Sequence, residues 1–344
     1  MGLKNDFMQQ EYEKRVNLED AIPLAVPLHI NIDPSNNCNY NCFMCPTDNK
    51  ISKKLNRPSG VMKIDLFKKI IDNISEMGIL KSLALYCDGE PFINKNLIEM
   101  ITYAKRSQAV KKIVITSNGS LITEEISEKI IETNALDLLI VSIYSPDEEH
   151  FKKITKQTKY SFADILKNIT YLRKVRDKYR KSLPEIYVKM IEGSIYEDEY
   201  KKLMLDFKDI ADHIGQDFPD NWDNSDIFLS SIEKKYDVPV DDITFCPKPW
   251  YSLNIAFNGD VRICCADWSH STVIGNVSEN NLKEIWTGNR MFAFRKKIIE
   301  HNFSEKDICL KCNFFKKKHF GQTIKSDNID NLIMTNPEKA LVMI

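Results

Sequence analysis

A regular alternation of strand-like and helix-like segments runs from residue 28 to residue 214. Short apolar or alternating runs predict strands, and these cover residues 28–33, 80–86, 112–116, 136–143 and 186–191. Apolar residues at helical spacing predict helices, and these cover residues 65–77, 96–105, 124–133, 147–156, 162–178 and 198–214. Such alternation builds parallel β-α units, so the pattern predicts an α/β fold. It fits a partial or complete barrel as well as a doubly wound sheet, and both bind ligands at the carboxyl ends of the strands.

The composition of the chain changes at residues 216–245, which are rich in proline and aspartate. Such a stretch is typical of a domain boundary. The residues before Pro27 are polar and charged and read as an arm. We therefore divide the chain into an N-terminal arm at 1–26, a core domain at 27–235, a small cysteine-bearing domain at 236–320 and a C-terminal tail at 321–344.

Charge and hydropathy exclude several classes of partner. Charged residues make up 28% of the chain and the formal net charge is -1, which favours neither nucleic acid nor an anionic membrane as a partner. No run of eighteen apolar residues occurs, and the N-terminus lacks the apolar core of a secretory signal. We therefore expect a cytoplasmic protein with no membrane and no nucleic acid partner. In that compartment the nine cysteines are expected to serve metal or redox chemistry.

Three cysteines follow the first expected strand within eight residues, at Cys38, Cys42 and Cys45. Cubane iron–sulfur clusters normally take four thiolates, so three leave one iron open to another ligand. A zinc site completed by a fourth residue is the alternative. No histidine lies in the loop, and the loop follows a strand of an α/β domain, where ligands bind. Both observations favour the cluster.

This C-x3-C-x2-C loop resembles the hallmark of the radical S-adenosylmethionine (SAM) superfamily. The resemblance implies a partial (β/α)6 TIM-type barrel over 27–235 and a [4Fe-4S] cluster held by Cys38, Cys42 and Cys45. The amino and carboxylate groups of SAM would chelate the fourth iron, and reductive cleavage of SAM would yield a 5′-deoxyadenosyl radical that removes a substrate hydrogen. Met44 stands where the family usually has an aromatic residue, and it would contact the adenine.

Further segments resemble SAM-binding motifs of this family. Residues 86–92 read Tyr-Cys-Asp-Gly-Glu-Pro-Phe, similar to a Gly-Gly-Glu-Pro motif in which Gly89 and Glu90 would bind the SAM amino group and Asp88 replaces the first glycine. Ser117 and Asn118 follow the third expected strand and could bind ribose or carboxylate oxygens. The alternative for that pair is a plain turn that caps the next helix. Ser142 matches a ribose-contacting serine, although Tyr144 stands where aspartate is common.

A second set of cysteines lies in the C-terminal region, at Cys246, Cys264, Cys309 and Cys312. Asn258-Gly259 predicts a hairpin turn, which places Cys264 along a returning strand. Four thiolates bind zinc or a complete iron–sulfur cluster, and the spacing leaves both open. The set resembles the SPASM/twitch extension of radical SAM enzymes, which implies one auxiliary [4Fe-4S] cluster at 236–320. The glycine spacing favours Cys264 over Cys265 as the ligand.

The leading functional hypothesis is a radical SAM oxidoreductase that oxidises a small polyol, sugar or aminocyclitol, with the auxiliary cluster accepting the electron. An electron donor such as flavodoxin or ferredoxin would reduce the SAM-binding cluster. The alternatives are a peptide-modifying maturase, a radical epimerase and a non-enzymatic zinc protein. Cys87 is the one catalytic candidate, as a hydrogen donor for an epimerase, against the simpler role of a small buried apolar residue.

Overall fold

The computed structural model describes residues 18–47, 57–191, 196–217, 246–304 and 307–312. Its centre is a run of parallel strands that follow each other in sequence order without closing into a ring. These strands are β1 His29–Ile32, β2 Leu80–Ala84, β3 Val110–Ser117, β4 Leu138–Ser142, β5 Glu185–Ile191 and β6 His213–Asp217. The expected α/β fold with a partial barrel is confirmed.

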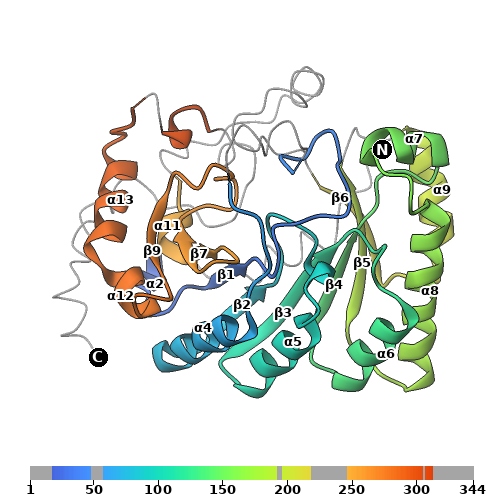
Figure 1. Ribbon diagram of the computed structural model, residues 1–344, viewed down its shortest axis with the longest axis horizontal. Helices are drawn as coiled ribbons and strands as arrows, with labels where there is room; N and C mark the ends of the chain where they lie inside the picture. Colours follow the sequence, from blue (N-terminus) through green and yellow to red (C-terminus); the bar gives the residue numbers. More distant parts are fainter. Residues whose placement is uncertain (1–17, 48–56, 192–195, 218–245, 305–306, 313–344) are drawn as a thin grey trace.

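Helices connect these strands and form an arc along the outside of the sheet (Figure 1). They are α4 Ile64–Met77, α5 Leu97–Arg106, α6 Glu124–Thr133, α7 Glu148–Thr155, α8 Phe162–Lys178 and α9 Glu197–Phe207, and the one-turn helix η1 Pro91–Ile93 follows β2. Several begin at side-chain caps; for example, Ser161 accepts a hydrogen bond from the backbone of Asp164 at the start of α8.

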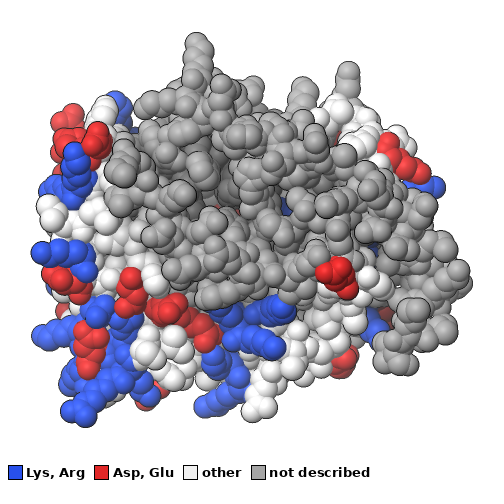
Figure 2. Space-filling view, turned by 180° about the vertical axis from the view of Figure 1, so that it is seen from behind, with Lys and Arg blue, Asp and Glu red and all other residues white. Residues whose placement is uncertain are grey.

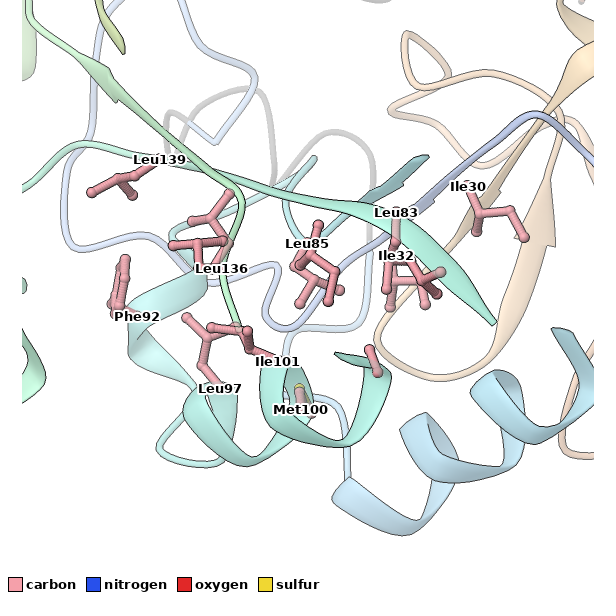
Figure 3. Close-up of a cluster of buried hydrophobic side chains, with 14 of the residues drawn as sticks. Ile30, Ile32, Leu83, Leu85, Phe92, Leu97, Met100, Ile101, Leu136 and Leu139 are labelled. Carbon is pink, nitrogen blue, oxygen red and sulfur yellow. The ribbon is translucent and has the colours of Figure 1, made fainter. Parts of the chain in front are cut away.

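The main apolar core lies between the sheet and these helices. Ile30 and Ile32 of β1 and Leu83 of β2 are fully buried, and Ile32 and Leu83 point toward α5 (Figure 3). Because side chains alternate across a strand, the intervening residues face the barrel interior. Asn31 there donates a hydrogen bond to Asn254 Oδ1 at 2.7 Å. The interior side of β1 is therefore polar and continues toward Asp33 at the carboxyl end of the strand.

The C-terminal strands extend the same sheet. Strand β7 Ser252–Ile255 pairs in parallel with β1, and β8 Asp260–Arg262 and β9 Val273–Asn276 follow in antiparallel order. The sheet among the described residues thus has nine strands in the order β6-β5-β4-β3-β2-β1-β7-β8-β9. Gly259 forms the expected hairpin turn with a φ of 91°. Four further α-helices and a short 3-10 helix complete the described part: α2 Leu18–Ala21, α11 Lys248–Tyr251, α12 Leu282–Thr287, α13 Asn289–Ile299 and η3 Ile308–Lys311.

One expected helix is shorter than its pattern indicated. The helix expected over 198–214 ends at Phe207, and Ile214 lies in β6, which the pattern did not predict. Arg176 of α8 binds Asp212 at 2.5 Å, and Asp212 in turn accepts a hydrogen bond from the backbone of Ile186. This tertiary contact turns the chain into the sheet where helical periodicity alone would continue. The boundary at 235/236, most of the arm and the tail at 321–344 lie outside the described residues, so the domain limits stay predictions.

The visible surface carries charges of both signs. Lysine and arginine side chains lie beside aspartate and glutamate side chains on the part of the rear face that the structure describes (Figure 2). No helix among the described residues is long and apolar enough to cross a membrane.

Candidate functional site

The first cysteine loop is held to the barrel by backbone hydrogen bonds. It follows β1 and carries Cys38, Cys42 and Cys45. The N–H groups of Asn41 and Phe43 donate to carbonyls at the end of α7, each at 3.0 Å. Cys45 N–H donates to the Cys42 carbonyl, also at 3.0 Å. These bonds fix the loop across the carboxyl edge of the sheet, the edge where α/β proteins bind ligands.

The thiols of this loop lie close enough to influence one another. None of them forms a disulfide; Cys42 is buried, and Cys38 and Cys45 are half-buried. Burial, with a smaller contribution from the neighbouring Cys45, raises the pKa of Cys38 to about 12. Burial and the charges of Cys45 and Cys38 raise the pKa of Cys42 as well. Three converging thiols that resist ionisation in isolation fit a cationic metal centre, which would compensate their thiolate charges.

The spacing of the thiols bears on the zinc alternative. A tetrahedral zinc would bring its sulfur ligands to about 3.8 Å from one another. Among the described residues, the one group of candidate ligands whose atoms all lie within 4.8 Å is Asp33, Cys87 and Asp88. Neither expected cysteine set is drawn together that tightly.

Three expected SAM contacts lie together. The buried carboxylate of Glu90 accepts hydrogen bonds from Ser117 Oγ and from the Asn118 backbone, each at 2.9 Å. Burial raises the pKa of Glu90 to about 7. Asn118 Nδ2 also donates to Asn39 Oδ1 of the cysteine loop at 2.9 Å, which joins this group to the first cysteine set.

Gly89 lies against the backbone of the cysteine loop. A Cβ atom at this position would lie 2.5 Å from the carbonyl oxygen of Ser35 and closer still to that of Asn37. Both oxygens belong to the backbone of the loop that follows β1, so a side chain at position 89 would displace this loop. The glycine is needed here for the close approach of two backbone segments.

The other expected residues are more dispersed. Met44 is half-buried in the loop and packs against the main core. Ser142 ends β4, and among the described residues no hydrogen bond joins it to Glu90, Ser117 or Asn118. Cys87 is half-buried and contacts the C-terminal region, where its Sγ lies 3.7 Å from the carbonyl oxygen of Cys265.

The second cysteine set comes from three separate segments. Cys246 precedes α11, Cys264 follows β8, and Cys309 and Cys312 lie at η3. Burial raises the pKa of Cys246 to about 11, with a further contribution from Cys312. Burial raises the pKa of Cys309 to about 12, with contributions from Cys246 and Cys312. The fold thus brings distant cysteines into mutual electrostatic range.

Cys264 and Cys265, which are adjacent at the end of β8, lie in different environments. The Ala266 N–H lies 3.3 Å from the Cys264 sulfur. The Cys265 sulfur lies 3.6 Å from Nζ of Lys248, a buried lysine of α11. The hydrogen bond with Cys265 and burial raise the pKa of Cys264, and the charge of Cys246 makes a smaller contribution in the same direction.

A buried ion-pair network lies between the two cysteine sets, and the sequence did not reveal it. Arg262 of β8 is fully buried and binds Asp33 at 3.1 Å and Asp88 at 2.6 Å. Arg57 and His270 also contact Asp88. The one feature of the sequence that could have indicated this network was Asp88, which stands in place of a motif glycine. Its carboxylate joins the barrel to the strand that leads to Cys264.

The two carboxyl groups of this network titrate differently. Burial and the neighbouring Asp88 raise the pKa of Asp33. Burial alone would also raise the pKa of Asp88, but the charges of Arg262 and Arg57 and the hydrogen bond from His270 hold it below its usual value. Asp88 is therefore the ionised partner of Arg262.

Comparisons with known proteins agree with this arrangement. A family model of the radical SAM superfamily matches residues 32–183, and a model of the SPASM iron–sulfur cluster-binding domain matches residues 246–313. An S-adenosyl-L-methionine-dependent 2-deoxy-scyllo-inosamine dehydrogenase from Niallia circulans is 21% identical over 83% of this chain and 92% of its own length. A GTP 3',8-cyclase from Desulforamulus reducens is 26% identical over 41% of each protein.

Solved structures show the same fold. The structure of BtrN in complex with AdoMet and 2-DOIA has a TM-score of 0.54 at 17% identity and covers 87% of this chain and 99% of that chain. Streptococcus suis SuiB bound to S-adenosylmethionine has a TM-score of 0.61 at 15% identity and covers 95% of this chain and 83% of that chain. The chain belongs to the radical SAM superfamily and carries a C-terminal SPASM domain, so it is an enzyme whose cofactors are SAM, a SAM-binding [4Fe-4S] cluster and an auxiliary iron–sulfur cluster.

Proposed function

We propose that this enzyme is an oxidoreductase that oxidises a secondary alcohol of a small polyol, sugar or aminocyclitol to a ketone. The similarity to a SAM-dependent 2-deoxy-scyllo-inosamine dehydrogenase carries the proposal, because it spans 83% of this chain and 92% of that enzyme. The GTP 3',8-cyclase similarity spans only 41% of that protein, so it supports the shared chemistry and not the substrate.

The first cysteine set is proposed to hold the SAM-binding cluster. Cys38, Cys42 and Cys45 supply three thiolates from one loop, and three protein ligands leave one iron for SAM. When bound, the cluster and SAM supply the 5′-deoxyadenosyl radical that removes a hydrogen atom from the substrate. The electron for this cleavage would come from a donor such as flavodoxin or ferredoxin.

The neighbouring polar residues are proposed to orient SAM. Glu90 offers a carboxylate for the SAM ammonium, and Ser117 and Asn118 already hold that carboxylate in place at 2.9 Å. Gly89 permits the close approach of the loop. Met44 and Ser142 are proposed to contact the adenine and ribose.

The second cysteine set is proposed to hold the auxiliary cluster through Cys246, Cys264, Cys309 and Cys312. Four thiolates leave no open iron, which suits electron transfer and not substrate binding. This matches the proposed reaction, since oxidation to a ketone releases one electron after the hydrogen atom has been removed.

A peptide-modifying maturase is the second candidate. Streptococcus suis SuiB bound to precursor peptide SuiA has the same fold, with a TM-score of 0.60, and covers 92% of this chain and 76% of that chain. At 14% identity this likeness supports the fold alone. The dehydrogenase similarity reaches across more of the relative's length and favours the small alcohol.

An epimerase would need a hydrogen donor, and Cys87 was its candidate. The Cys87 sulfur lies 3.5 Å from Nη2 of Arg262 and 3.7 Å from the Cys265 carbonyl. Both contacts tie it to the boundary between the barrel and the C-terminal strands. They support a packing role for this thiol.

The test is an anaerobic assay of the reconstituted enzyme with SAM, a reductant and a panel of aminocyclitols and polyols. The proposal predicts a ketone and 5′-deoxyadenosine in a ratio of about one to one for at least one member of the panel. SAM cleavage without any ketone across the panel, together with modification of a peptide, would favour the maturase instead.

A further inference from the structure

The loop between β8 and β9 holds His270 in a backbone conformation that side chains rarely adopt. Its φ is 56°, a strained conformation that persists only where neighbouring contacts enforce it. Buried Asp267 provides those contacts: its carboxylate accepts hydrogen bonds from the N–H groups of Ser271 at 2.9 Å and Thr272 at 2.7 Å. Its carbonyl accepts a bond from Arg262 Nη1 at 2.6 Å. The loop therefore fixes the position of one imidazole.

The ring of His270 is oriented by an ionised carboxylate. Nε2 of His270 lies 3.2 Å from Asp88 Oδ2, and Asp88 also binds Arg262 and Arg57. A carboxylate paired with two guanidinium groups only accepts hydrogen bonds, so Nε2 must carry the hydrogen. The lone pair of the neutral ring then lies on Nδ1. No hydrogen bond joins Nδ1 to any residue the structure describes, and the side chain is 14% exposed.

His270 is connected to both proposed cofactor sites, to one through Asp88 and to the other along the chain. Its partner Asp88 directly precedes Gly89 of the SAM motif, at the carboxyl end of β2. In the chain His270 follows Cys264 by six residues. Substrates of barrel enzymes bind at this end of the strands. A substrate between SAM and the auxiliary cluster would therefore lie on the side of the barrel that His270 occupies.

We propose that Nδ1 of His270 accepts the hydroxyl proton of the alcohol during its oxidation, an inference that rests on the proposed function. Removal of a hydrogen atom from the carbinol carbon leaves a carbon-centred radical that still carries its O–H group. Formation of the C=O bond then releases one proton and one electron. The proton goes to Nδ1, and the auxiliary iron–sulfur cluster is the one-electron oxidant. Histidine is the commonest side chain for such general-base work.

The surrounding charges suit this role. The carboxyl groups of Asp33 and Asp88 face two guanidinium groups, Arg57 and Arg262, within one buried network. A proton on His270 adds a positive charge directly beside Asp88. Asp88 is thus a positioning residue that fixes the tautomer and stabilises the charged imidazole, as a carboxylate partner does in other histidine-dependent sites.

The first test separates hydrogen abstraction from ketone formation. His270→Gln keeps an N–H donor for Asp88 but cannot accept a proton. We expect this variant to form 5′-deoxyadenosine while the ketone formed per 5′-deoxyadenosine falls at least about tenfold, since general bases contribute about 10²–10⁴-fold. The matched control is His150→Gln, because His150 also pairs with a carboxylate, Glu199 at 2.8 Å, away from Asp88. The control should keep the wild-type ratio.

A second measurement tests the geometry without turnover. The chain has six histidines, so 15N-histidine spectra of the reconstituted, oxidised enzyme can be assigned by comparison with His270→Gln. We expect the His270 ring to carry its proton on Nε2 in the wild-type enzyme and to lose that preference in Asp88→Asn. A proton on Nδ1 in the wild-type enzyme would overturn the proposal.

The outcomes distinguish this inference from the function on which it rests. If the wild-type enzyme forms no ketone from any alcohol, the proposed function fails. If the wild-type enzyme forms ketone and His270→Gln does so with the same ratio and rate as His150→Gln, only the role of His270 is overturned.

Discussion

The two cysteine sets of this chain are built in opposite ways. Cys38, Cys42 and Cys45 lie in one loop that follows one strand, and a few backbone bonds to α7 hold that loop. The second set draws its members from segments that begin at residue 246 and end at residue 312, and β7, β8 and η3 bring them together. The first set is formed within a single loop, whereas the second set forms only when the C-terminal strands have joined the sheet.

This difference indicates how far each site relies on packing elsewhere in the protein. A local loop can keep its ligands close even when distant packing weakens. The dispersed set relies on the pairing of β7 with β1 and on the ion pairs of Arg262 with Asp33 and Asp88. We therefore expect damage at the boundary between barrel and C-terminal strands to affect the auxiliary site before the SAM site.

The largest effect on activity is expected when a cysteine of the first set is removed. Cys42→Ala removes the buried ligand of the loop, so SAM cleavage should fall to the level of cluster-free protein. The iron content should fall from about eight to about four per chain, because a [4Fe-4S] cluster holds four irons. Iron analysis and quantification of 5′-deoxyadenosine check this outcome. Cys87→Ala is the control and should keep both values; equal loss in Cys87→Ala would contradict the assignment.

Removal of a cysteine from the second set should affect ketone formation but not SAM cleavage. Cys264→Ala should also reduce iron to about four per chain, yet SAM cleavage should continue while ketone formation stops. Cys265→Ala, the adjacent residue, should keep the full iron content. Electron paramagnetic resonance of the reduced variants would identify which cluster is lost. If Cys265→Ala loses the auxiliary cluster and Cys264→Ala keeps it, the ligand is Cys265.

Stability should depend on the network between the two sets. Arg262→Met removes a fully buried cation and leaves Asp33 and Asp88 facing each other, which is expected to lower the free energy of unfolding by about 3–5 kcal/mol. Chemical unfolding under anaerobic conditions measures this. The control Lys129→Met breaks an exposed pair with Glu125 and should cost under about 1 kcal/mol. A loss for Arg262→Met as small as that of the control would contradict the network's role.

A smaller effect on the free energy of unfolding is expected from the protonation of Glu90, which depends on pH. Burial raises its folded-state pKa to about 7 from the ordinary value of 4.5, so the folded protein binds this proton more tightly than the unfolded chain does. The resulting stability is fully present below about pH 4.5 and is lost as the pH rises to about 7, a change of about 3 kcal/mol in total. Glu90→Gln should lack this component.

Unfolding of both proteins between pH 5 and 8, without SAM, measures the difference. The stability of wild type relative to Glu90→Gln should decline over this range. A constant difference would mean that Glu90 is ionised in the folded protein throughout.

The sequence predicted the local features well because they depend on short-range spacing. The parallel strands, most helices, the Cys38–Cys45 loop and the Asn258-Gly259 hairpin follow from periodicity and turn chemistry. The contacts of Arg262 could not be predicted in the same way, because they join Asp33, 229 residues away, and Asp88, 174 residues away. Strand β6 was missed because Asp212 redirects the chain through its tertiary contact with Arg176.

The continuity of the sheet was also not apparent from the sequence. The change in composition at residues 216–245 suggested a separate C-terminal unit, and nothing in the pattern of Ser252–Ile255 indicates β1 as its partner. Parallel pairing between strands so distant in the chain is decided by the packing of the whole core. The same packing decides where the second cysteine set converges.

The most direct test of the two-site account is anaerobic reconstitution of the full chain, followed by metal and sulfide analysis and a SAM-cleavage assay with reductant. The account predicts about eight irons and about eight sulfides per chain, with formation of 5′-deoxyadenosine. About two zinc ions per chain, no sulfide and no cleavage of SAM in folded protein would contradict it.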